Sequence, residues 1–545
     1  MTHIRNPILP GFNPDPSIIR VGSDYYLATS TFEWFPGVAI YHSRDLKNWK
    51  LLPHPLNRLS QLDLTGVETA KGVWAPCLSY CEADQLYYLV YTNMYSHCSQ
   101  FFDMDNFVVT AKHIEGPWSE PIYINSSGFD PSLFHDDDGR KWVTNLEWET
   151  RSGYEQPGPI VLQEWCPKTQ KLLGRPKRIY RGGTDRGCLE APHLYKRNGF
   201  YYLMTAEGGT GYGHAVVMAR SKAIDGPYEA DPEGAMLTNV PEEFNERHII
   251  DCAKPNRYNS ESILQKSGHG SLVETQNGEW YIPHLCSRPL LPSLRCPLGR
   301  ETSIQKAYWN DEGWLRLSSG GNMALMETEA PQLTEHPFPP KPARDEFDSE
   351  SLDNKYQSYR IPIDPSWASL TARAGHLRIR GQGSIFSSRR MSLIARRITS
   401  FKFTAETCLE FSPWHASQSA GLTCFYSASN LYYLRVYNSE SLGGRTLGLI
   451  KGDNGEKTEY PEFRVKLTDW NKIYLKAELN HSELQFSYSP DGINWKNYGD
   501  VLDASILSDE YPFHKFTGCF VGLFAQDLHT QEMHADFDYF EYRNI

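Results

Sequence analysis

Three acidic residues occur in closely similar settings although they lie far apart along the chain. Asp15 stands in NPDPS, Asp130 in FDPS and Glu190 in EAPH, so a proline follows each acid within two residues. Carboxylates gathered in a partly desolvated site disfavour joint ionisation, so at least one should keep its proton near neutral pH. A protonated carboxyl beside an ionised one is the pair that hydrolysis of a glycosidic bond requires.

Each acid taken alone has a simpler structural explanation. An aspartate before a proline more often begins a strand or a turn than takes part in catalysis. The equivalent placement of all three reverses that judgement, because the stability of the fold does not call for it. Two carboxyls suffice for hydrolysis, so the third would hold the sugar, orient the acid or raise the acid's affinity for its proton.

Other candidate residues admit two interpretations each. His269 lies between two glycines and is either a hydrogen-bonded channel histidine or a contact to a ligand or metal. Arg288 and Arg300 could pair with the catalytic carboxylates or simply compensate their charge. Phe32 and Trp74 could stack on a sugar ring, although aromatic residues of this kind more often serve in packing.

A unit typical of a β-hairpin is repeated five times. The copies cover residues 15–30, 74–92, 130–146, 190–206 and 269–285. Each has a short apolar strand, a turn and a second strand that carries Tyr or Trp. Successive copies begin 59, 56, 60 and 79 residues apart, which is enough for a four-stranded sheet and its loops. Five such sheets around one axis predict a five-bladed β-propeller.

The propeller would bring the opening residues of the repeats together. The first strand of a blade lines the central channel, and a proline costs no ladder bond at the start of a strand. We therefore expect one mouth of the channel to collect the residues Asp15, Trp74, Asp130, Glu190 and His269. Trp74 and Glu190 stand one place early relative to the other three, which suggests a β-bulge.

The repeat pattern ends near residue 325. We predict that residues 1–325 form the propeller, that a proline-rich stretch at 326–345 is an extended linker, and that residues 346–545 form a second domain. Strands of alternating apolar and polar residues in the last part, such as LYYLRVY and ELQFSYS, predict a β-sandwich. The expected fold class is all-β.

Composition excludes several classes of function. The chain of 545 residues has 66 acidic and 54 basic side chains, and no run of Lys and Arg could follow a phosphate backbone. We therefore expect no nucleic-acid partner. The sequence has no apolar segment of membrane-spanning or signal-peptide type, and its 11 cysteines are scattered, which predicts a soluble cytoplasmic protein with reduced thiols and no membrane partner.

In these motifs the chain resembles the two-domain β-xylosidases of glycoside hydrolase family 43. The likeness spans nearly the whole length through NPILPGFNPDPS, TFEWFPG, GVWAP, GFDPS, CLEAPH, HGSLVETQNGEWY, CPLGRET and FTGCFVGLFAQD. It implies an inverting enzyme built from a five-bladed propeller and a jelly-roll, concanavalin-like sandwich. The expected reaction releases xylose from the non-reducing ends of xylo-oligosaccharides, and α-L-arabinofuranosidase activity can accompany it.

The resemblance also implies a role for each site residue. Asp15 would be the general base, Glu190 the general acid, and Asp130 would tune the pKa of the acid and orient it. Base and acid carboxyls would then stand about 6.5–9.5 Å apart to admit the water. The residues that would shape the sugar pocket are Phe32, Trp74, His269, Arg300 and, from the sandwich, Phe516, with Arg288 as a further candidate from the sequence itself.

Two other functions remain open at this point. A retaining hydrolase that cleaves fructans has a similar architecture, but its Asn-Asp-Pro-Asn motif is absent, since this chain reads Asn-Pro-Asp-Pro. A propeller can also bind carbohydrate without catalysis. The resemblance implies no required cofactor, allows a calcium ion beside His269, and suggests a homo-oligomer that acts on xylo-oligosaccharides or aryl xylosides.

Overall fold

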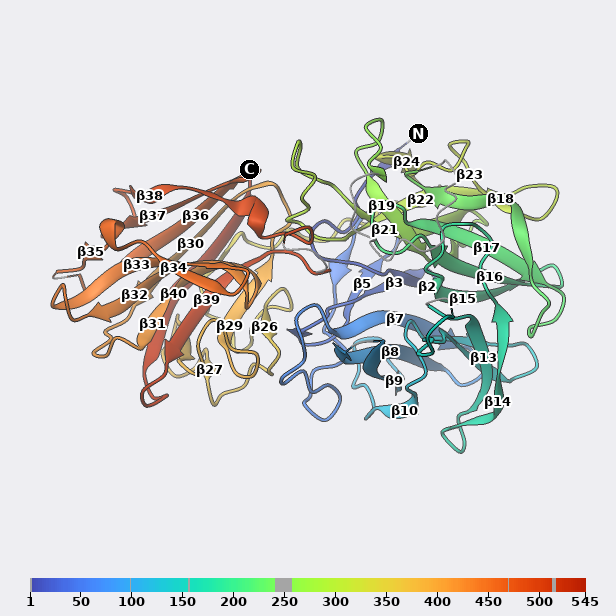
Figure 1. Ribbon diagram of the computed structural model, residues 1–545, viewed down its shortest axis with the longest axis horizontal. Coiled ribbons are helices and arrows are strands. Elements are labelled where there is room, and N and C mark those ends of the chain that lie inside the picture. Colours follow the sequence, from blue (N-terminus) through green and yellow to red (C-terminus); the bar gives the residue numbers. More distant parts are fainter. Residues whose placement is uncertain (1, 99, 155–156, 241–256, 469, 512–515) are drawn as a thin grey trace.

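The chain folds into two β-structured units that lie side by side. The computed structural model describes residues 2–98, 100–154, 157–240, 257–468, 470–511 and 516–545. In Figure 1 the N-terminal unit lies at the right and the C-terminal unit at the left. Within the described residues, no helix is long and apolar enough to cross a membrane.

The N-terminal unit is the predicted five-bladed propeller. Its five sheets follow one another along the chain and are all antiparallel. The first two blades consist of β2 (Ser17–Val21), β3 (Asp24–Thr29), β5 (Ala39–Ser43) and β6 (Lys50–Leu51), and of β7 (Gly72–Cys81), β8 (Leu86–Cys98), β9 (Phe101–Ala111) and β10 (Ile122–Asn125). The third consists of β11 (Ser132–His135), β12 (Lys141–Leu146), β13 (Ile160–Cys166) and β14 (Lys171–Tyr180).

The last two blades complete the ring. The fourth consists of β15 (Glu190–Arg197), β16 (Phe200–Glu207), β17 (Ala215–Ser221) and β18 (Glu229–Thr238). The fifth consists of β19 (Gln265–Gly270), β20 (Val273–Glu274), β21 (Trp280–Ser287), β22 (Glu301–Trp309) and β23 (Leu315–Leu317). Apolar clusters fill the spaces between blades. One of them joins Tyr25 and Leu27 of the first blade to Tyr281 and Ile304 of the fifth, which closes the circle.

The boundary of the propeller lies slightly later than the sequence predicts. β24 (Glu327–Glu329) falls in the predicted linker, yet it pairs with β1 (His3–Arg5) near the N-terminus. The other end of that linker is also ordered, since β25 (Arg344–Asp345) pairs with the last strand of the chain. Only the stretch between these two strands runs without a ladder partner among the described elements.

The C-terminal unit is a sandwich of two large antiparallel sheets. The first sheet contains β25, β27 (Ala368–Ser369), β28 (Leu377–Arg380), β30 (Lys402–Glu410), β36 (Ile473–Asn480), β37 (Glu483–Ser489), β38 (Lys496–Asp503) and β40 (His534–Asn544). The second contains β26 (Gln357–Tyr359), β29 (Ser392–Arg397), β31 (Gln418–Ser427), β32 (Asn430–Ser439), β33 (Gly444–Asp453), β34 (Glu456–Glu459), β35 (Val465–Lys466) and β39 (Phe520–Asp527). Two 3-10 turns complete the unit, η2 (Pro461–Phe463) and η3 (Ala504–Ile506).

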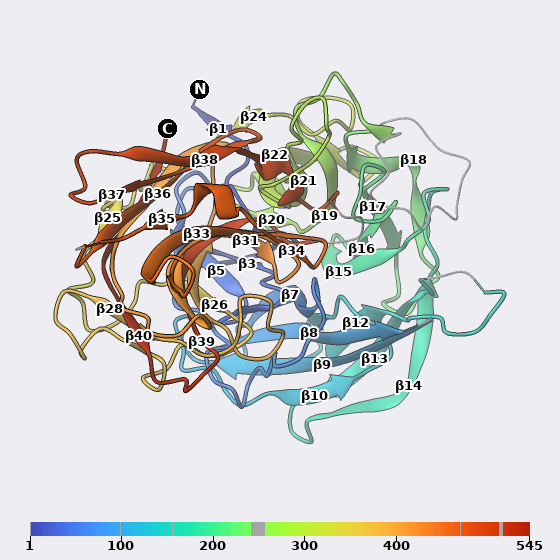
Figure 2. The ribbon, with the colours of Figure 1, turned by 60° about the vertical axis from the view of Figure 1, so that its left-hand side comes forward.

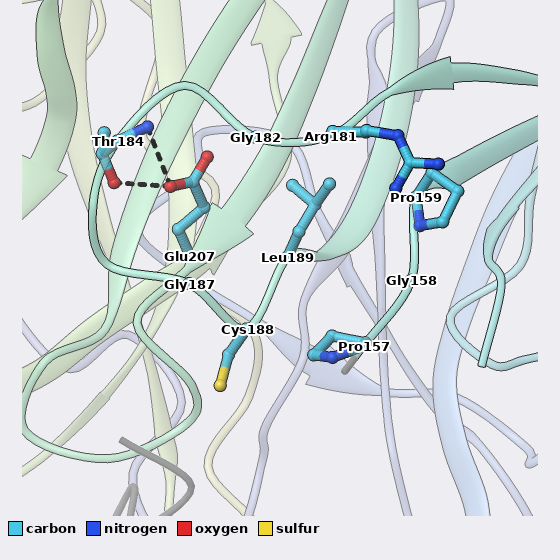
Figure 3. A pocket seen from close by; sticks show the side chains of 10 residues that line it. All are labelled: Pro157, Gly158, Pro159, Arg181, Gly182, Thr184, Gly187, Cys188, Leu189 and Glu207. Atoms are coloured by element: carbon cyan, nitrogen blue, oxygen red, sulfur yellow. Dashed lines mark hydrogen bonds between the residues drawn. The ribbon is translucent and has the colours of Figure 1, made fainter. Parts of the chain in front are cut away.

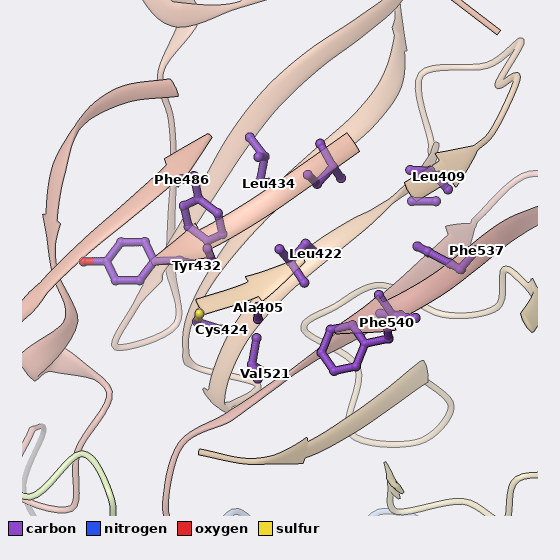
Figure 4. Packing of buried hydrophobic residues seen from close by; sticks show 14 of the residues in the cluster. Ala405, Leu409, Leu422, Cys424, Tyr432, Leu434, Phe486, Val521, Phe537 and Phe540 are labelled. Atoms are coloured by element: carbon purple, nitrogen blue, oxygen red, sulfur yellow. The ribbon is translucent and has the colours of Figure 1, made fainter. Parts of the chain in front are cut away.

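The two sheets meet through side chains that alternate along the strands. Leu422 and Leu434 of one sheet and Phe486 and Phe537 of the other are all fully buried in the same cluster. Figure 4 shows these side chains lying in the space between the ribbons. β36 shows the period-two burial that the alternating sequence predicts for a strand with one apolar face. β31 is buried along its whole length, because the other face of its sheet packs against propeller residues that include Phe12 and Phe32.

The propeller also supplies one strand to the sandwich. β4 (Trp34–Phe35) pairs with β26, so that Trp34 lies opposite Tyr359 at the edge of the second sheet. The Trp34 ring stacks on Phe520 with centroids 3.6 Å apart. The motif TFEWFPG therefore joins the two units.

Candidate active site

One backbone position is strained in the same way in all five blades. The small or polar residues Ser17, Cys77, Ser132, His193 and Ser271 occupy the same place in the five repeats. The residue two places before each of them has a positive φ, with values of 58° at Asp15, 38° at Ala75, 54° at Asp130, 55° at Ala191 and 44° at His269. Such a conformation costs free energy in a non-glycine residue and persists where the surrounding structure enforces it. The backbone of each repeat therefore bends in the same way just before its small or polar residue.

This comparison explains the offset seen in the sequence. The structural equivalents of Asp15 are Ala75 and Ala191, so Trp74 and Glu190 stand one residue earlier in their blades. Register shifts occur between Trp74 and Cys77 and between Glu190 and His193, as a β-bulge requires. The predicted bulge is confirmed, and it gives Trp74 and Glu190 a different direction of approach from the aspartates.

Asp15 is buried and held from two sides. Ser30 donates its hydroxyl to Oδ2 of Asp15 at 2.6 Å, and the same hydroxyl accepts the Ala75 backbone N–H at 2.8 Å. Arg300 donates to Oδ1 at 3.1 Å, and Nδ1 of His269 lies 3.6 Å from the same oxygen. Both carboxylate oxygens of Asp15 therefore accept a hydrogen bond from a side chain.

Asp130 links the base to the acid. Its Oδ2 accepts the backbone N–H of Ala191, the neighbour of Glu190, at 3.0 Å. Burial and the negative charge of Asp15 raise the pKa of Asp130 to about 8, against the opposing effects of the Ala191 hydrogen bond and Arg300. The direction of this shift favours the protonated form of Asp130.

The raised pKa of Asp130 predicts a pH-dependent stability. An aspartate in the unfolded chain has a pKa near 3.9, so between about pH 4 and pH 8 only the folded state binds this proton. The free energy of unfolding then falls as pH rises, by about 1.4 kcal/mol per pH unit from this group. In Asp130→Asn this contribution is missing, so the melting temperature of the variant minus that of the wild type should increase from pH 5 to pH 8 in calorimetry. A difference independent of pH would contradict the assignment.

Glu190 is the first residue of β15 and follows the loop of residues 181–189, which Glu207 holds in place. It pairs with Ala206, and the next residue, Glu207, is fully buried. The Glu207 carboxylate accepts the backbone N–H of Gly183 at 2.6 Å and both the N–H and the hydroxyl of Thr184 (Figure 3). Two consecutive amides around a carboxylate form an anion-binding nest. The nest fixes the loop that leads into Glu190.

Space beside this loop is small. The cavity that Figure 3 shows between the loop and residues 157–159 has a volume of about 20 Å³, room for roughly one water. A side chain at Gly183 would meet the Tyr180 hydroxyl at 2.5 Å, so glycine is required here. Close packing on both sides leaves the approach to Glu190 little freedom.

Arg300 connects the propeller site to the sandwich. Besides Asp15, it donates to the Thr210 hydroxyl at 2.8 Å and to the backbone carbonyl of Phe516 at 3.2 Å. Its guanidinium lies 5.2 Å from the ring centroid of Phe32 and 5.6 Å from that of Phe516. The Phe32 ring in turn lies 5.7 Å from Trp74. These aromatic residues and the arginine form one wall.

Arg288 does not join this group in the same way. Its Nε and Nη2 donate to the two carboxylate oxygens of Glu301 at 2.7 and 2.8 Å, and Oε1 of Glu301 also accepts the Gly11 backbone N–H at 2.9 Å. The expected pairing with a catalytic carboxylate is thus replaced by a structural pair with Glu301. Glu301 directly follows Arg300 in the sequence and is not one of the three candidate catalytic acids.

The resemblance allows a calcium ion beside His269, whose Nδ1 lies 3.6 Å from Oδ1 of Asp15. Calcium takes six to eight oxygen ligands, whereas the neighbours of His269 include the Arg300 cation. Burial lowers the pKa of His269, and Arg300 adds to this effect while Asp15 opposes it. Among the described residues no group of three His, Cys, Asp or Glu side chains could hold a metal.

Several residues of the site were not found from the sequence. Ser30 and Thr210 hold Asp15 and Arg300, Glu301 holds Arg288, and His214 approaches Glu190 with Nε2 of the ring 3.6 Å from Oε1. Ser30 had one usable signal, because the second strand of a hairpin returns to the mouth from which the first strand starts. The others lie outside the repeated hairpin units.

Comparisons with known proteins agree with this geometry. The family model described as "Glycosyl hydrolases family 43" matches residues 4–315, and the model "Beta xylosidase C-terminal Concanavalin A-like domain" matches residues 344–543. The chain is 46% identical over 553 residues to the Xylosidase/arabinosidase 43B of Humicola insolens, covering 100% of this chain and 98% of that protein.

Two further relatives cover the whole chain. The Xylan 1,3-beta-xylosidase of a Vibrio species is 43% identical over 555 residues, covering 99% of each protein. The crystal structure of xylan beta-1,4-xylosidase from Bacillus halodurans C-125 superposes with a TM-score of 0.93 at 48% sequence identity, covering 99% of this chain and 100% of that one. Both the fold and the order of the two domains are therefore shared with these proteins.

Proposed function

Because the chain belongs to glycosyl hydrolase family 43, we propose that it is an exo-acting, inverting glycosidase that releases xylose from the non-reducing ends of xylo-oligosaccharides. The observation that carries this proposal is the contact chain among three acids from three blades. Asp130 binds the amide next to Glu190, and its pKa is raised by the charge of Asp15. Asp130 therefore connects the charge of Asp15 with the backbone beside Glu190.

The proposed reaction needs one water and two proton transfers. Asp15 takes a proton from the water, whose oxygen attacks the anomeric carbon from the face opposite the leaving group. Glu190 gives its proton to the glycosidic oxygen as the bond breaks. The products are xylose of inverted configuration and a sugar chain shorter by one unit, and the proton on Asp15 returns to Glu190 through solvent.

Asp130 has a supporting role in this scheme. Its hydrogen bond from the Ala191 backbone N–H fixes the first residues of strand β15 and with them the backbone of Glu190. Because its raised pKa favours the protonated form, Asp130 adds no second full charge beside Asp15. Arg300 can then keep Asp15 ionised while a neutral sugar occupies the pocket.

The distribution of exposure supports attack at a chain end. Asp15, Asp130 and Phe32 are buried, whereas Glu190, Trp74 and Phe516 remain partly exposed. The buried residues form the floor and the partly exposed ones the rim, with Phe516 supplied by the sandwich. A site of this shape accepts one terminal sugar, so that the remaining chain lies outside.

A neighbouring groove offers a place for the rest of the substrate. It has a volume of about 630 Å³, and Phe102 and Trp148 contribute to its walls. The Trp148 ring lies 5.8 Å from Phe129, which lies 5.4 Å from Trp74, so aromatic faces continue from the pocket to the groove. Such faces suit the apolar faces of sugar rings.

Xylobiose hydrolysis followed by proton NMR tests the proposal. Inversion requires α-xylose as the first-formed anomer from a β-xyloside, whereas a retaining fructan-type hydrolase would give retained configuration, and a binding protein would give no product. We expect β-1,4-xylobiose to be cleaved, and the Vibrio relative makes the β-1,3 isomer the informative comparison. Paired aryl xyloside and arabinofuranoside substrates measure the second activity. We also propose that no metal is required, so a chelator in the same assay should leave the rates unchanged, and a loss of rate would favour a calcium ion beside His269.

We also propose that the enzyme works in the cytoplasm as a homo-oligomer on short substrates taken up by the cell. The resemblance to the family supports this proposal. Light scattering during size exclusion measures the assembly, and a monomer would contradict this part.

A further inference from the structure

A fully buried histidine faces the proposed acid and has no role in the scheme above. His214 directly precedes β17, and its side chain has 0% exposed surface. A Cβ atom at Gly268 would lie 2.3 Å from the His214 ring, so only glycine at position 268 leaves the ring its space. The ring is therefore held in one place by the neighbouring blade.

The tautomer of His214 follows from its partner. Nδ1 lies 3.2 Å from the backbone carbonyl of Lys266, and a carbonyl can only accept a hydrogen bond, so Nδ1 carries the proton. Lys266 has a φ of 58° and lies at a register shift in β19. The strand is thus distorted at the residue whose carbonyl accepts from the ring. Distortions of this kind cluster next to functional sites.

The other nitrogen then presents a lone pair. Nε2 is buried and finds no hydrogen-bond partner among the described residues, and it lies 3.6 Å from Oε1 of Glu190. A lone pair aimed at a carboxyl favours the protonated carboxyl, which can donate to it, over the carboxylate, which cannot. Catalytic pairs of this length tighten when substrate binds.

We propose that His214 is a positioning residue that accepts the proton of the Glu190 carboxyl as a hydrogen bond and so keeps Glu190 in its acid form. This inference rests on the proposed function, in which Glu190 is the general acid. The proton remains on Glu190 until it passes to the leaving oxygen, and Nε2 orients it without taking it.

The groups around the ring support a neutral imidazole. Burial, the neighbouring His269, Arg300 and His284 lower the pKa of His214 well below its usual value, and the hydrogen bond to the Lys266 carbonyl opposes them. Glu190 is the acidic group that faces the ring. A neutral ring with its proton on Nδ1 is the state that can accept from a carboxylic acid.

Nitrogen NMR of histidine-labelled enzyme tests the tautomer directly, without activity. Comparison with His214→Gln assigns the signal. We expect a neutral Nδ1–H ring at pH 7, and either an Nε2–H ring or a charged imidazolium would overturn the proposal.

Kinetics test the effect on Glu190. His214→Phe keeps a planar ring and removes the acceptor, so the alkaline limb of kcat should move about one pH unit lower for xylobiose. At a pH above that limb this is a loss of about tenfold. An activated aryl xyloside, which needs little protonation, should be affected much less. An unmoved limb, or an equal loss on both substrates, would overturn the proposal.

Two further variants separate this effect from damage to the fold. Gly268→Ala displaces the ring without removing it and should give the same substrate-dependent loss. His54→Phe is the matched control, because His54 is another buried histidine with Nδ1 2.7 Å from a backbone carbonyl, that of Val38. It should lower the melting temperature and leave the alkaline limb in place.

The same assay distinguishes this inference from the proposed function. If Glu190→Gln abolishes xylobiose cleavage while His214→Phe leaves the limb unmoved, only the role of His214 fails. If Glu190→Gln cleaves xylobiose at the normal rate, Glu190 is not the acid and the proposed function fails first.

Discussion

Glu190→Gln should lower kcat on xylobiose by about 10³-fold, since general acid catalysis contributes 10²–10⁴. An amide cannot protonate the leaving oxygen, and a sugar alkoxide is a poor leaving group without that proton. An aryl xyloside with an acidic phenol leaves unaided, so its kcat should fall only a few-fold. The ratio of the two rate losses, measured on the same preparation, is the diagnostic quantity.

A matched control for this variant lies in the same blade. Asp231 is a buried acid of β18 that pairs with Arg316 at 2.6 Å. Asp231→Asn should reduce stability and leave the ratio between the two substrates unchanged. Equal losses on xylobiose and on the aryl xyloside in Glu190→Gln would remove Glu190 from the role of acid.

Asp15→Asn should abolish activity on both substrates, with kcat lowered by about 10³-fold or more. Water must be deprotonated whatever the leaving group, so an activated phenol cannot compensate. The amide oxygen of Asn can take the place of Oδ1 and accept from Arg300, which lies at 3.1 Å, and the amide nitrogen can take the place of Oδ2 and donate to the Ser30 hydroxyl, which lies at 2.6 Å. We therefore expect KM to change only a few-fold.

Rescue of Asp15→Asn by an aryl xyloside is the result that contradicts its role as base. The split between kcat and KM is the internal control, because disruption of the pocket would raise KM as well. Ser30→Ala provides a comparison, since it removes one hydrogen bond to Asp15 and retains the carboxylate. A modest loss is expected there.

The number of blades could be predicted because each blade repeats a hairpin with its own turn residues. Turns such as Asp-Gly at 138–139 and Asn-Gly at 198–199 fix short hairpins whatever the distant contacts are. The common mouth of the acids followed from that repetition. The direction of each side chain did not, because a bulge at Trp74 and another at Glu190 depend on packing between blades.

Partners from distant parts of the chain were the least predictable. Arg288 pairs with Glu301 of a neighbouring strand, and the His214 ring is oriented by the backbone carbonyl of Lys266, which is 52 residues away. Neither contact has a periodic signal, because each is set by the three-dimensional placement of whole blades. The resemblance to the family gave Phe516 its place near the pocket, and Arg300 meets its carbonyl there.

β4 makes the two units depend on each other. A propeller expressed alone would leave this short strand without its neighbour β26, and Trp34 would lose the Phe520 ring on which it stacks. The severed surfaces would carry exposed aromatic groups and an open ladder edge, both of which promote aggregation. The smallest fragment with a complete sugar pocket is therefore the full pair of units. Replacing one unit by a related domain would require compensating substitutions in the other.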